Sequence, residues 1–265
     1  MRFNLFYPVY VLMLLVSTAC ERGGPETPPP PAALQPATTF TDPPRSDIRG
    51  FVTLCDEFGV VKAKSDSMIV SLEGLQTAFP ARTRPEGRFT IANVFGGNYN
   101  LSYNKPRSEY GNFKQIGIVH TGGLITVANS VTIWERAKTV PSNLSVSIKG
   151  LNLTLSGVTG PVQPVGTADE QKRRVRLFFG RDEKVSHLSY VTTWGQVVVP
   201  PGSTGEFAEK LLADELQAFQ PGERVYVIAY GITAFENAYV DPETKRKVYT
   251  GINPTPSNVV SFILP

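Results

Sequence analysis

From residue 47 onwards, apolar side chains alternate with polar ones at a period of two, and this alternation constrains the fold more than any other feature. It is clearest over residues 48–54, 68–72 and 99–103. A period of two places alternate side chains on opposite faces of a β-strand, whereas an amphipathic helix needs a period of 3.6. No amphipathic helix lies between these segments. The pattern therefore predicts an all-β protein, and the residues from 47 onwards are numerous enough for two β-sandwich domains in tandem.

Turn-forming residues separate the predicted strands. The clearest turn is Arg84-Pro85-Glu86-Gly87, in which proline takes the second position of a type I turn and glycine the fourth. In the second half of the chain, alternation continues at 144–155, 175–179 and 225–230. The apolar residues of 206–218 fit either a helix or a strand, and we interpret 207–211 as a strand followed by a short turn.

Residues 1–19 are predicted to be a lipoprotein signal peptide. A cationic start is followed by about twelve apolar residues, too few to cross a bilayer of ~30 Å as a helix. Ser17-Thr18-Ala19 then precede Cys20, an ending that resembles the lipobox of Bacteroidetes-type bacterial lipoproteins. The resemblance implies that Cys20 is lipidated, bearing palmitate-type acyl chains, and anchors the protein in the outer membrane on either its periplasmic or its surface face. A plain secretory signal cut near Ala19 is the alternative.

Residues 20–46 are predicted to be a tether. The segment is rich in proline and has no periodic apolar face, so it cannot bury enough surface to fold. Proline-rich chains favour the extended polyproline II conformation, at about 3.1 Å per residue. Placed after a lipid anchor, such a segment would hold the folded part away from the membrane.

Residues 47–135 show a family pattern. Gly87-Arg88-Phe89 is followed about ten residues later by Gly96-Gly97-Asn98-Tyr99, after strands at 48–52 and 70–72. This order resembles the carboxypeptidase regulatory-like domain, a transthyretin-like sandwich of seven strands. The resemblance implies a rigid, non-catalytic spacer or docking unit that lacks the zinc ligands of a carboxypeptidase.

Residues 137–265 show a second pattern. A Pro221-Gly222 turn precedes the strand 225–230, which alternates valine with tyrosine and ends in Ala-Tyr. This half is similar to fibronectin type III or Ig-like domains of bacterial lipoproteins. Its segments 157–174 and 241–247 are longer than the pattern requires, and enlarged end loops are where such sandwiches place binding surfaces.

Neither charge nor motifs indicate an enzyme. The chain has 26 basic and 23 acidic residues, so its net charge of +3 gives no field for nucleic acid or for an anionic membrane. The basic clusters 172–176 and 245–247 are interpreted as solvated hairpin ends. Serine-hydrolase, phosphate-loop, zinc-protease and paired CxxC motifs are absent from the sequence. We therefore predict no catalytic residues, no metal site and no cofactor.

Two single residues are predicted to be structural. Cys55 has no disulfide partner once Cys20 is lipidated, and it ends a predicted strand, where a lone cysteine is usually a small buried apolar residue. His120 also ends a strand, and metal binding there would need further ligands that the neighbouring sequence lacks.

A few residues are candidates for ligand contact or modification. Tyr103, Tyr110, Phe113 and Trp194 are predicted as an aromatic surface for a glycan or peptide, although Tyr103 and Trp194 could instead pack in the cores. Ser67, in Asp66-Ser67-Met68, matches a loose O-glycosylation sequon. The leading hypothesis is a non-catalytic lipoprotein that binds or scaffolds another envelope protein. The alternative is a surface adhesin or glycan-capture protein.

Overall fold

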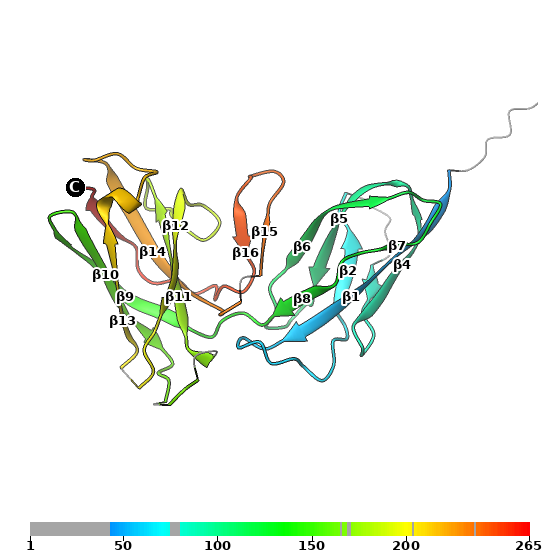
Figure 1. Ribbon diagram of the computed structural model, residues 1–265, viewed down its shortest axis with the longest axis horizontal. Helices are drawn as coiled ribbons and strands as arrows, with labels where there is room; N and C mark the ends of the chain where they lie inside the picture. Colours follow the sequence, from blue (N-terminus) through cyan, green and yellow to red (C-terminus); the bar gives the residue numbers. More distant parts are fainter. Residues whose placement is uncertain (1–42, 75–79, 165, 169–170, 203, 236) are drawn as a thin grey trace, which may run out of the picture. The chain divides into compact units, whose positions relative to one another are not determined.

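The computed structural model describes residues 43–74, 80–164, 166–168, 171–202, 204–235 and 237–265. Residues 42–265 form one compact unit. The regular structure in the described residues is β-strand, apart from one short 3₁₀ turn. The fold is therefore all-β, with its strands gathered in two sandwiches, as the period of two predicts (Figure 1). Among these residues, no helix is long and apolar enough to cross a membrane.

The first sandwich contains strands β1 to β8. One sheet has the order β4-β1-β7, with β8 pairing with the later part of β1, and the other has the order β3-β2-β5-β6. β1 begins two residues inside the range predicted as tether. The bounds are β1 Arg45–Cys55, β2 Ile69–Leu72, β3 Ala81–Arg82, β4 Arg88–Phe95, β5 Gly97–Asn104, β6 Phe113–His120, β7 Thr126–Val127 and β8 Val131–Trp134.

The core of the first sandwich is formed by the inward-facing residues of these strands. Ile48, Val52 and Leu54 alternate along β1 and are all buried, as are Leu101 and Tyr103 of β5. This alternation is the one that the sequence shows. Burial of such side chains contributes about 25 cal/mol per Å² of apolar surface, so the two inner faces hold the sheets together.

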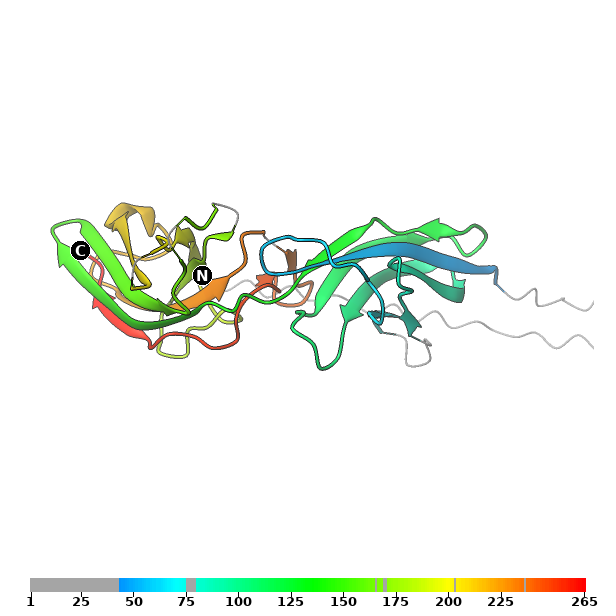
Figure 2. The same ribbon diagram turned by 90° about the horizontal axis from the view of Figure 1, so that it is seen from below.

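The second sandwich contains strands β9 to β14 and β17. Its sheets have the orders β13-β10-β9 and β12-β11-β14-β17, and β15 and β16 form a separate hairpin (Figure 2). The bounds are β9 Val140–Lys149, β10 Asn152–Gly160, β11 Arg174–Gly180, β12 Thr192–Val198, β13 Glu206–Leu212, β14 Arg224–Ile232, β15 Ala238–Val240, β16 Lys247–Tyr249 and β17 Val260–Ile263.

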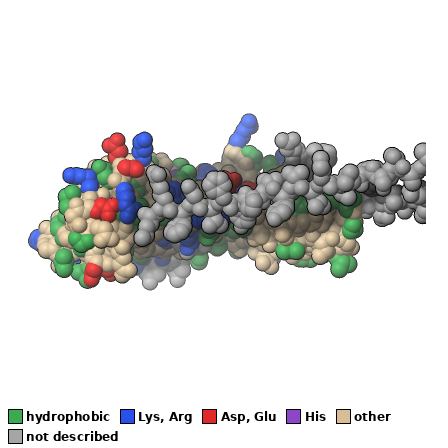
Figure 3. All heavy atoms as spheres, turned by 90° about the horizontal axis from the view of Figure 1, so that it is seen from above, with side chains coloured by type: hydrophobic (Ala, Val, Ile, Leu, Met, Phe, Trp, Pro, Cys, Tyr) green, Lys and Arg blue, Asp and Glu red, His purple; other side chains and the backbone are tan. Residues whose placement is uncertain are grey.

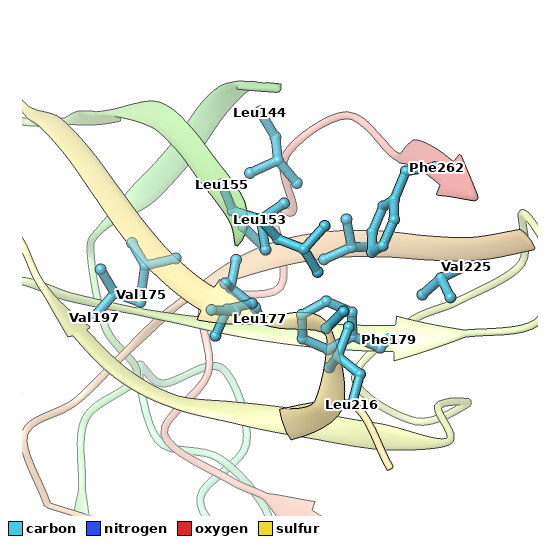
Figure 4. Packing of buried hydrophobic residues seen from close by; sticks show 14 of the residues in the cluster. Leu144, Leu153, Leu155, Val175, Leu177, Phe179, Val197, Leu216, Val225 and Phe262 are labelled. Carbon is cyan, nitrogen blue, oxygen red and sulfur yellow. The ribbon is translucent and has the colours of Figure 1, made fainter. Parts of the chain in front are cut away.

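The core of the second sandwich lies between its two sheets. Leu153 and Leu155 of β10 face Leu177 and Phe179 of β11, and Phe262 of β17 closes one side (Figure 4). All five side chains are buried. Deleting one of these large buried side chains is expected to cost about 2–5 kcal/mol. A slip of β10 by one residue would turn Leu153 and Leu155 away from this core, so the cluster also specifies the register of that strand.

The segment 206–218 is a strand followed by a turn, as interpreted from the sequence. β13 pairs with β10 along its whole length, from Glu206 opposite Val158 to Leu212 opposite Asn152. A 3₁₀ turn follows at Ala213–Glu215. Phe207 and Leu211, two of the residues that also fitted a helix, both point into the core. Residues four apart share one face of a strand and also one face of a helix, so these two positions alone do not distinguish the two structures.

The hairpin β15–β16 packs against the first sandwich rather than offering a free loop. Tyr239 of β15 meets the Phe113 ring edge-on, with centroids 6.0 Å apart. Phe235, just before the hairpin, stacks on Trp134 at 5.6 Å. Aromatic pairs at these distances stabilise a contact beyond the area they bury. The enlarged loop of this hairpin is expected from the sequence to carry a binding surface. The strands of the hairpin instead pack against the first sandwich.

Acidification is expected to destabilise the second sandwich through His187. The His187 ring packs edge-on to Tyr230, its Nδ1 atom has no hydrogen-bond partner among the described residues, and burial lowers its pKa. Below the unfolded-state pKa of about 6.5, the unfolded chain binds a proton that the folded chain resists, so stability falls as the pH falls. Urea denaturation at pH 7.5 and 5.5 should show a smaller loss for His187→Gln than for the wild type. An equal loss would contradict this role.

Cys55 is expected to be unreactive in the folded protein. Its side chain is buried at the end of β1, as predicted from the sequence, and burial raises the pKa of the thiol. Since the thiolate is the reactive form, a thiol reagent should label Cys55 at least ~100-fold more slowly in buffer than in denaturant. The measurement uses a Cys20→Ser protein, so that only one thiol is present. Rapid labelling in buffer would show that β1 opens locally.

Candidate functional site

The aromatic residues predicted as a ligand surface do not come together on the outside of the protein. Tyr103 is wholly buried in the first core, where its ring meets Phe89 edge-on, and burial raises the pKa of its hydroxyl. Tyr110 is also buried. The core interpretation left open for Tyr103 is the one that the structure shows. These two rings therefore present no face to a ligand.

Phe113 and Trp194 are half-buried and serve other contacts. Phe113 lies between Tyr103 and Tyr239. Trp194 packs against the core of the second sandwich, and its Nε1–H donates a hydrogen bond to Glu209 Oε1 at 2.8 Å. The half-buried rings thus join strands and sandwiches, and the predicted platform does not form from these four residues.

Two modification sites were predicted, and only one lies in the described residues. Cys20 lies outside them. Ser67 is exposed, just before β2, with a positive φ of 65°. Its hydroxyl donates a hydrogen bond to Asp66 at 3.0 Å. Ser67 is therefore accessible to a modifying enzyme, and its glycosylation stays a prediction.

The first sandwich carries an open cleft of about 620 Å³ that is rich in arginine. Four arginines, from β1, β3, β4 and the turn between β3 and β4, line it, and no acidic residue does. We call it the arginine cleft. Its lining residues are Arg49, Gly50, Phe51, Arg82, Arg84, Arg88, Phe89, Thr90, Val127, Ala128 and Ser130.

Strand register brings part of this cleft together. Arg49 and Phe51 are outward-facing, exposed residues of β1. Phe51 lies opposite Arg88 of β4, and Arg49 lies opposite Thr90 of β4 and Val127 of β7. Diagonal neighbours on one sheet face are about 7–8 Å apart, within reach of long side chains. The side chains of Arg49, Phe51 and Arg88 therefore lie on the same outer face of this sheet.

The turn between β3 and β4 adds Arg84 and fixes its place beside Arg88. Gly87 N–H donates to Arg84 O at 2.8 Å, which is the type I turn bond predicted from the sequence. Arg84 N–H also donates to Arg88 O at 2.9 Å. Gly87 has a φ of 89°, the left-handed conformation that glycine adopts without strain. This hairpin therefore holds two arginines at the rim of the cleft.

A buried threonine orients the other arm of the hairpin. Thr83 lies between Arg82 and Arg84 in sequence, and its hydroxyl donates to Ser65 O at 2.6 Å and accepts from Met68 N–H at 3.0 Å. Because this side chain points inward, its two neighbours point outward. Both arginines are exposed.

The charges of the cleft are only partly balanced. Arg49 donates to Asp47 at 3.0 Å, and this hydrogen bond lowers the pKa of the Asp47 carboxyl. Within the part of the chain that the structure describes, the guanidinium groups of Arg82, Arg84 and Arg88 have no ion pair or hydrogen bond. Like charges held close together repel, and an anionic ligand would relieve this repulsion. The cleft is therefore suited to an oxyanion such as a carboxylate, sulfate or phosphate.

Other basic residues are used within the fold or lie among acids. Arg173, from one of the basic clusters predicted as hairpin ends, donates to Thr139 Oγ1. Arg246, from the other, donates to Leu188 O. On the face of the second sandwich seen in Figure 3, Lys and Arg side chains are mixed with Asp and Glu. The arginine cleft differs from these regions because no acid lines it.

The described residues offer no metal centre. They contain no group of three or more His, Cys, Asp or Glu side chains that could hold a metal ion. His120 is buried, with Nδ1 2.8 Å from Thr126 Oγ1 and Nε2 3.1 Å from Val94 O, so both ring nitrogens have partners. Its place is structural, which agrees with the sequence interpretation.

Comparison with known proteins does not assign a family. No family model and no curated protein matches the sequence. Among solved structures, a candidate carbohydrate binding protein from Bacteroides uniformis is 12% identical, with coverage of 83% of this chain and 100% of that one and a TM-score of 0.31. A DUF3823 family protein from the same species is 13% identical, with coverage of 84% and 100% and a TM-score of 0.31. These identities and TM-scores are too low to transfer a fold or a function to this chain.

Proposed function

We propose that this chain is a non-catalytic lipoprotein of the bacterial outer membrane that binds an acidic surface of another envelope protein. One observation carries the proposal. The arginine cleft presents four guanidinium groups, of which Arg82, Arg84 and Arg88 have no acidic partner in the described residues. Arginine is the residue best suited to bidentate recognition of carboxylates at a protein interface.

Photo-crosslinking in intact envelopes tests this function. A photoreactive residue replaces Thr90, which is exposed within the cleft, and a second protein carries it at Lys149, which is exposed in the second sandwich. The proposal predicts a reproducible protein adduct from position 90 that is absent from position 149. If position 90 yields no adduct, or both positions yield the same one, the cleft is not the binding surface.

A second candidate function is the capture of an acidic glycan, as expected of a surface adhesin. One specific feature favours it: the exposed residues Phe51, Thr90 and Ser130 all line the cleft, so that it offers an aromatic ring and two hydroxyls. Aromatic faces with nearby hydroxyls and charges are typical of sugar sites. Direct binding of polygalacturonate to the purified protein, with no binding of poly-glutamate, would favour this function over the protein partner.

The lipid anchor is a separate part of the proposal and has its own test. Cells grown with labelled palmitate should incorporate the label into the wild-type protein and not into a Cys20→Ser variant. Equal labelling of both proteins would place the lipid elsewhere, and the absence of label from both would favour a plain secretory signal.

A further inference from the structure

Arg49 differs from the other arginines of the cleft because, among the described residues, its guanidinium group already holds a carboxylate. Arg49 Nη2 donates a hydrogen bond to Asp47 Oδ2 at 3.0 Å. The two residues are two positions apart on β1, and alternate residues of a strand share a face. Asp47 does not itself line the cleft, so its carboxylate reaches Arg49 from beside the cleft.

A bulge in β4 helps to place the Asp47 carboxylate. The register of β1 and β4 shifts between Ser46 and Ile48, so that Ala92 and Asn93 of β4 both lie opposite Asp47. Asn93 has a φ of 61°, a conformation that asparagine adopts more readily than most residues. Its backbone N–H donates a hydrogen bond to Asp47 Oδ1 at 3.4 Å. Bulges often re-aim a side chain beside a functional site, and here one carboxylate oxygen faces a backbone donor and the other faces the guanidinium group.

An anionic ligand that uses all four arginines has to compete with this internal carboxylate. The side chains of Arg49 and Asp47 are 52% and 29% exposed, so water and solutes reach the pair. Exposed ion pairs of this kind are weak. The guanidinium group of Arg49 can therefore exchange the Asp47 carboxylate for a carboxylate of the ligand, but the ligand gains less from Arg49 than it would from an unpaired arginine.

We propose that Asp47 is an internal competitor that sets the affinity and the selectivity of the arginine cleft. The inference rests on the proposed function, because it requires a carboxylate-bearing partner in the cleft. Displacing Asp47 costs free energy, which a partner recovers only if it also engages Arg82, Arg84 and Arg88. Asp47 therefore selects partners that present several carboxylates close together over those that present a single one.

A double-mutant cycle on Asp47 and Arg49, with poly-glutamate as the probe in isothermal titration calorimetry, tests this role. Asp47→Asn keeps an oxygen for the Asn93 N–H and removes the charge, and it should tighten binding about fivefold. Arg49→Ala should weaken binding about twofold in the wild type and about tenfold in the Asp47→Asn protein, where Arg49 is free to serve the ligand. In the Arg49→Ala background, Asp47→Asn should have no effect.

The matched control is Glu109→Gln, which removes an exposed acid of the same sandwich that lies outside the cleft. It should leave the affinity for poly-glutamate within about twofold of the wild type. An unchanged urea midpoint verifies that each variant folds.

Two results would overturn the role of Asp47 alone. Asp47→Asn could leave the affinity unchanged while Arg84→Ala/Arg88→Ala still abolishes binding, or it could tighten binding equally with and without Arg49. The second result would show plain charge repulsion in place of competition for Arg49. Failure of the proposed function looks different: poly-glutamate would bind neither the wild type nor Asp47→Asn, or its binding would not depend on Arg84 and Arg88, and the role of Asp47 would then be wrong as well.

Discussion

Replacing Gly87 by alanine is expected to destabilise the first sandwich by about 3 kcal/mol. Gly87 has a φ of 89°, a conformation that costs an alanine roughly 1–2 kcal/mol. In addition, the new Cβ would lie 2.0 Å from Val52 O, a backbone atom that cannot move without disturbing β1. Gly87 O also accepts the Val52 N–H at 2.9 Å, so the clash falls on the bond that joins this turn to the strand.

The measurement is urea denaturation followed by tryptophan fluorescence. The chain has two tryptophans, so in a Trp194→Phe background Trp134 alone reports on the first sandwich. The control is Gly222→Ala, in the second sandwich: its φ is 83°, but no heavy atom lies within 4 Å of the added Cβ. It should cost only about 1 kcal/mol, followed through Trp194 in a Trp134→Phe background. Equal effects of the two changes would show that the clash with Val52 does not contribute.

The double variant Arg84→Ala/Arg88→Ala is expected to bind an acidic peptide about 100-fold more weakly than the wild type. Each charge-assisted hydrogen bond contributes about 1.5 kcal/mol, and two of them correspond to this factor. Poly-glutamate is the probe, measured by isothermal titration calorimetry at low and high salt. Binding by the wild type should also weaken as salt is added, because exposed charges are screened.

The control for net charge is Lys149→Ala/Lys184→Ala, which removes two exposed positive charges from the second sandwich. It should leave the affinity within about twofold of the wild type, since those charges lie outside the cleft. The arginine variant should unfold at the same urea concentration as the wild type, because neither guanidinium group has an ion pair in the described residues. An equal loss of poly-glutamate affinity in the two variants would show that net charge, and not the arginine cleft, determines the binding.

Local patterns in the sequence predicted the strands and one turn well, because those features depend on nearby residues. The order Arg84-Pro85-Glu86-Gly87 predicts a turn, which the hydrogen bond from Gly87 N–H to Arg84 O closes. Proline favours the backbone conformation of the second turn position, and glycine that of the fourth. The strand at 207–211 is less clearly predicted, because Phe207 and Leu211 fit the spacing of a helix as well as that of a strand. Pairing with β10 decides for the strand.

The arginine cleft could not be found in the same way. Three of its arginines lie within residues 82–88, where other residues separate them, and the fourth, Arg49, comes from β1. Alternation alone places Arg49 and Arg88 on outward faces, but only the register that sets Phe51 opposite Arg88 joins them. The aromatic prediction failed for a related reason. Tyr103 occupies an inward position of β5, so its flanking loop did not bring it to the surface.

The most direct test of the central proposal is a titration followed by NMR. Poly-glutamate is added to the labelled protein, and the side-chain Nε–H resonances of the arginines are assigned by substitution. If the arginine cleft is the binding surface, the resonances of Arg49, Arg82, Arg84 and Arg88 shift together and saturate at one concentration. If these four resonances stay in place while those of Arg173 or Arg246 move, or if none moves, the proposed binding surface is wrong.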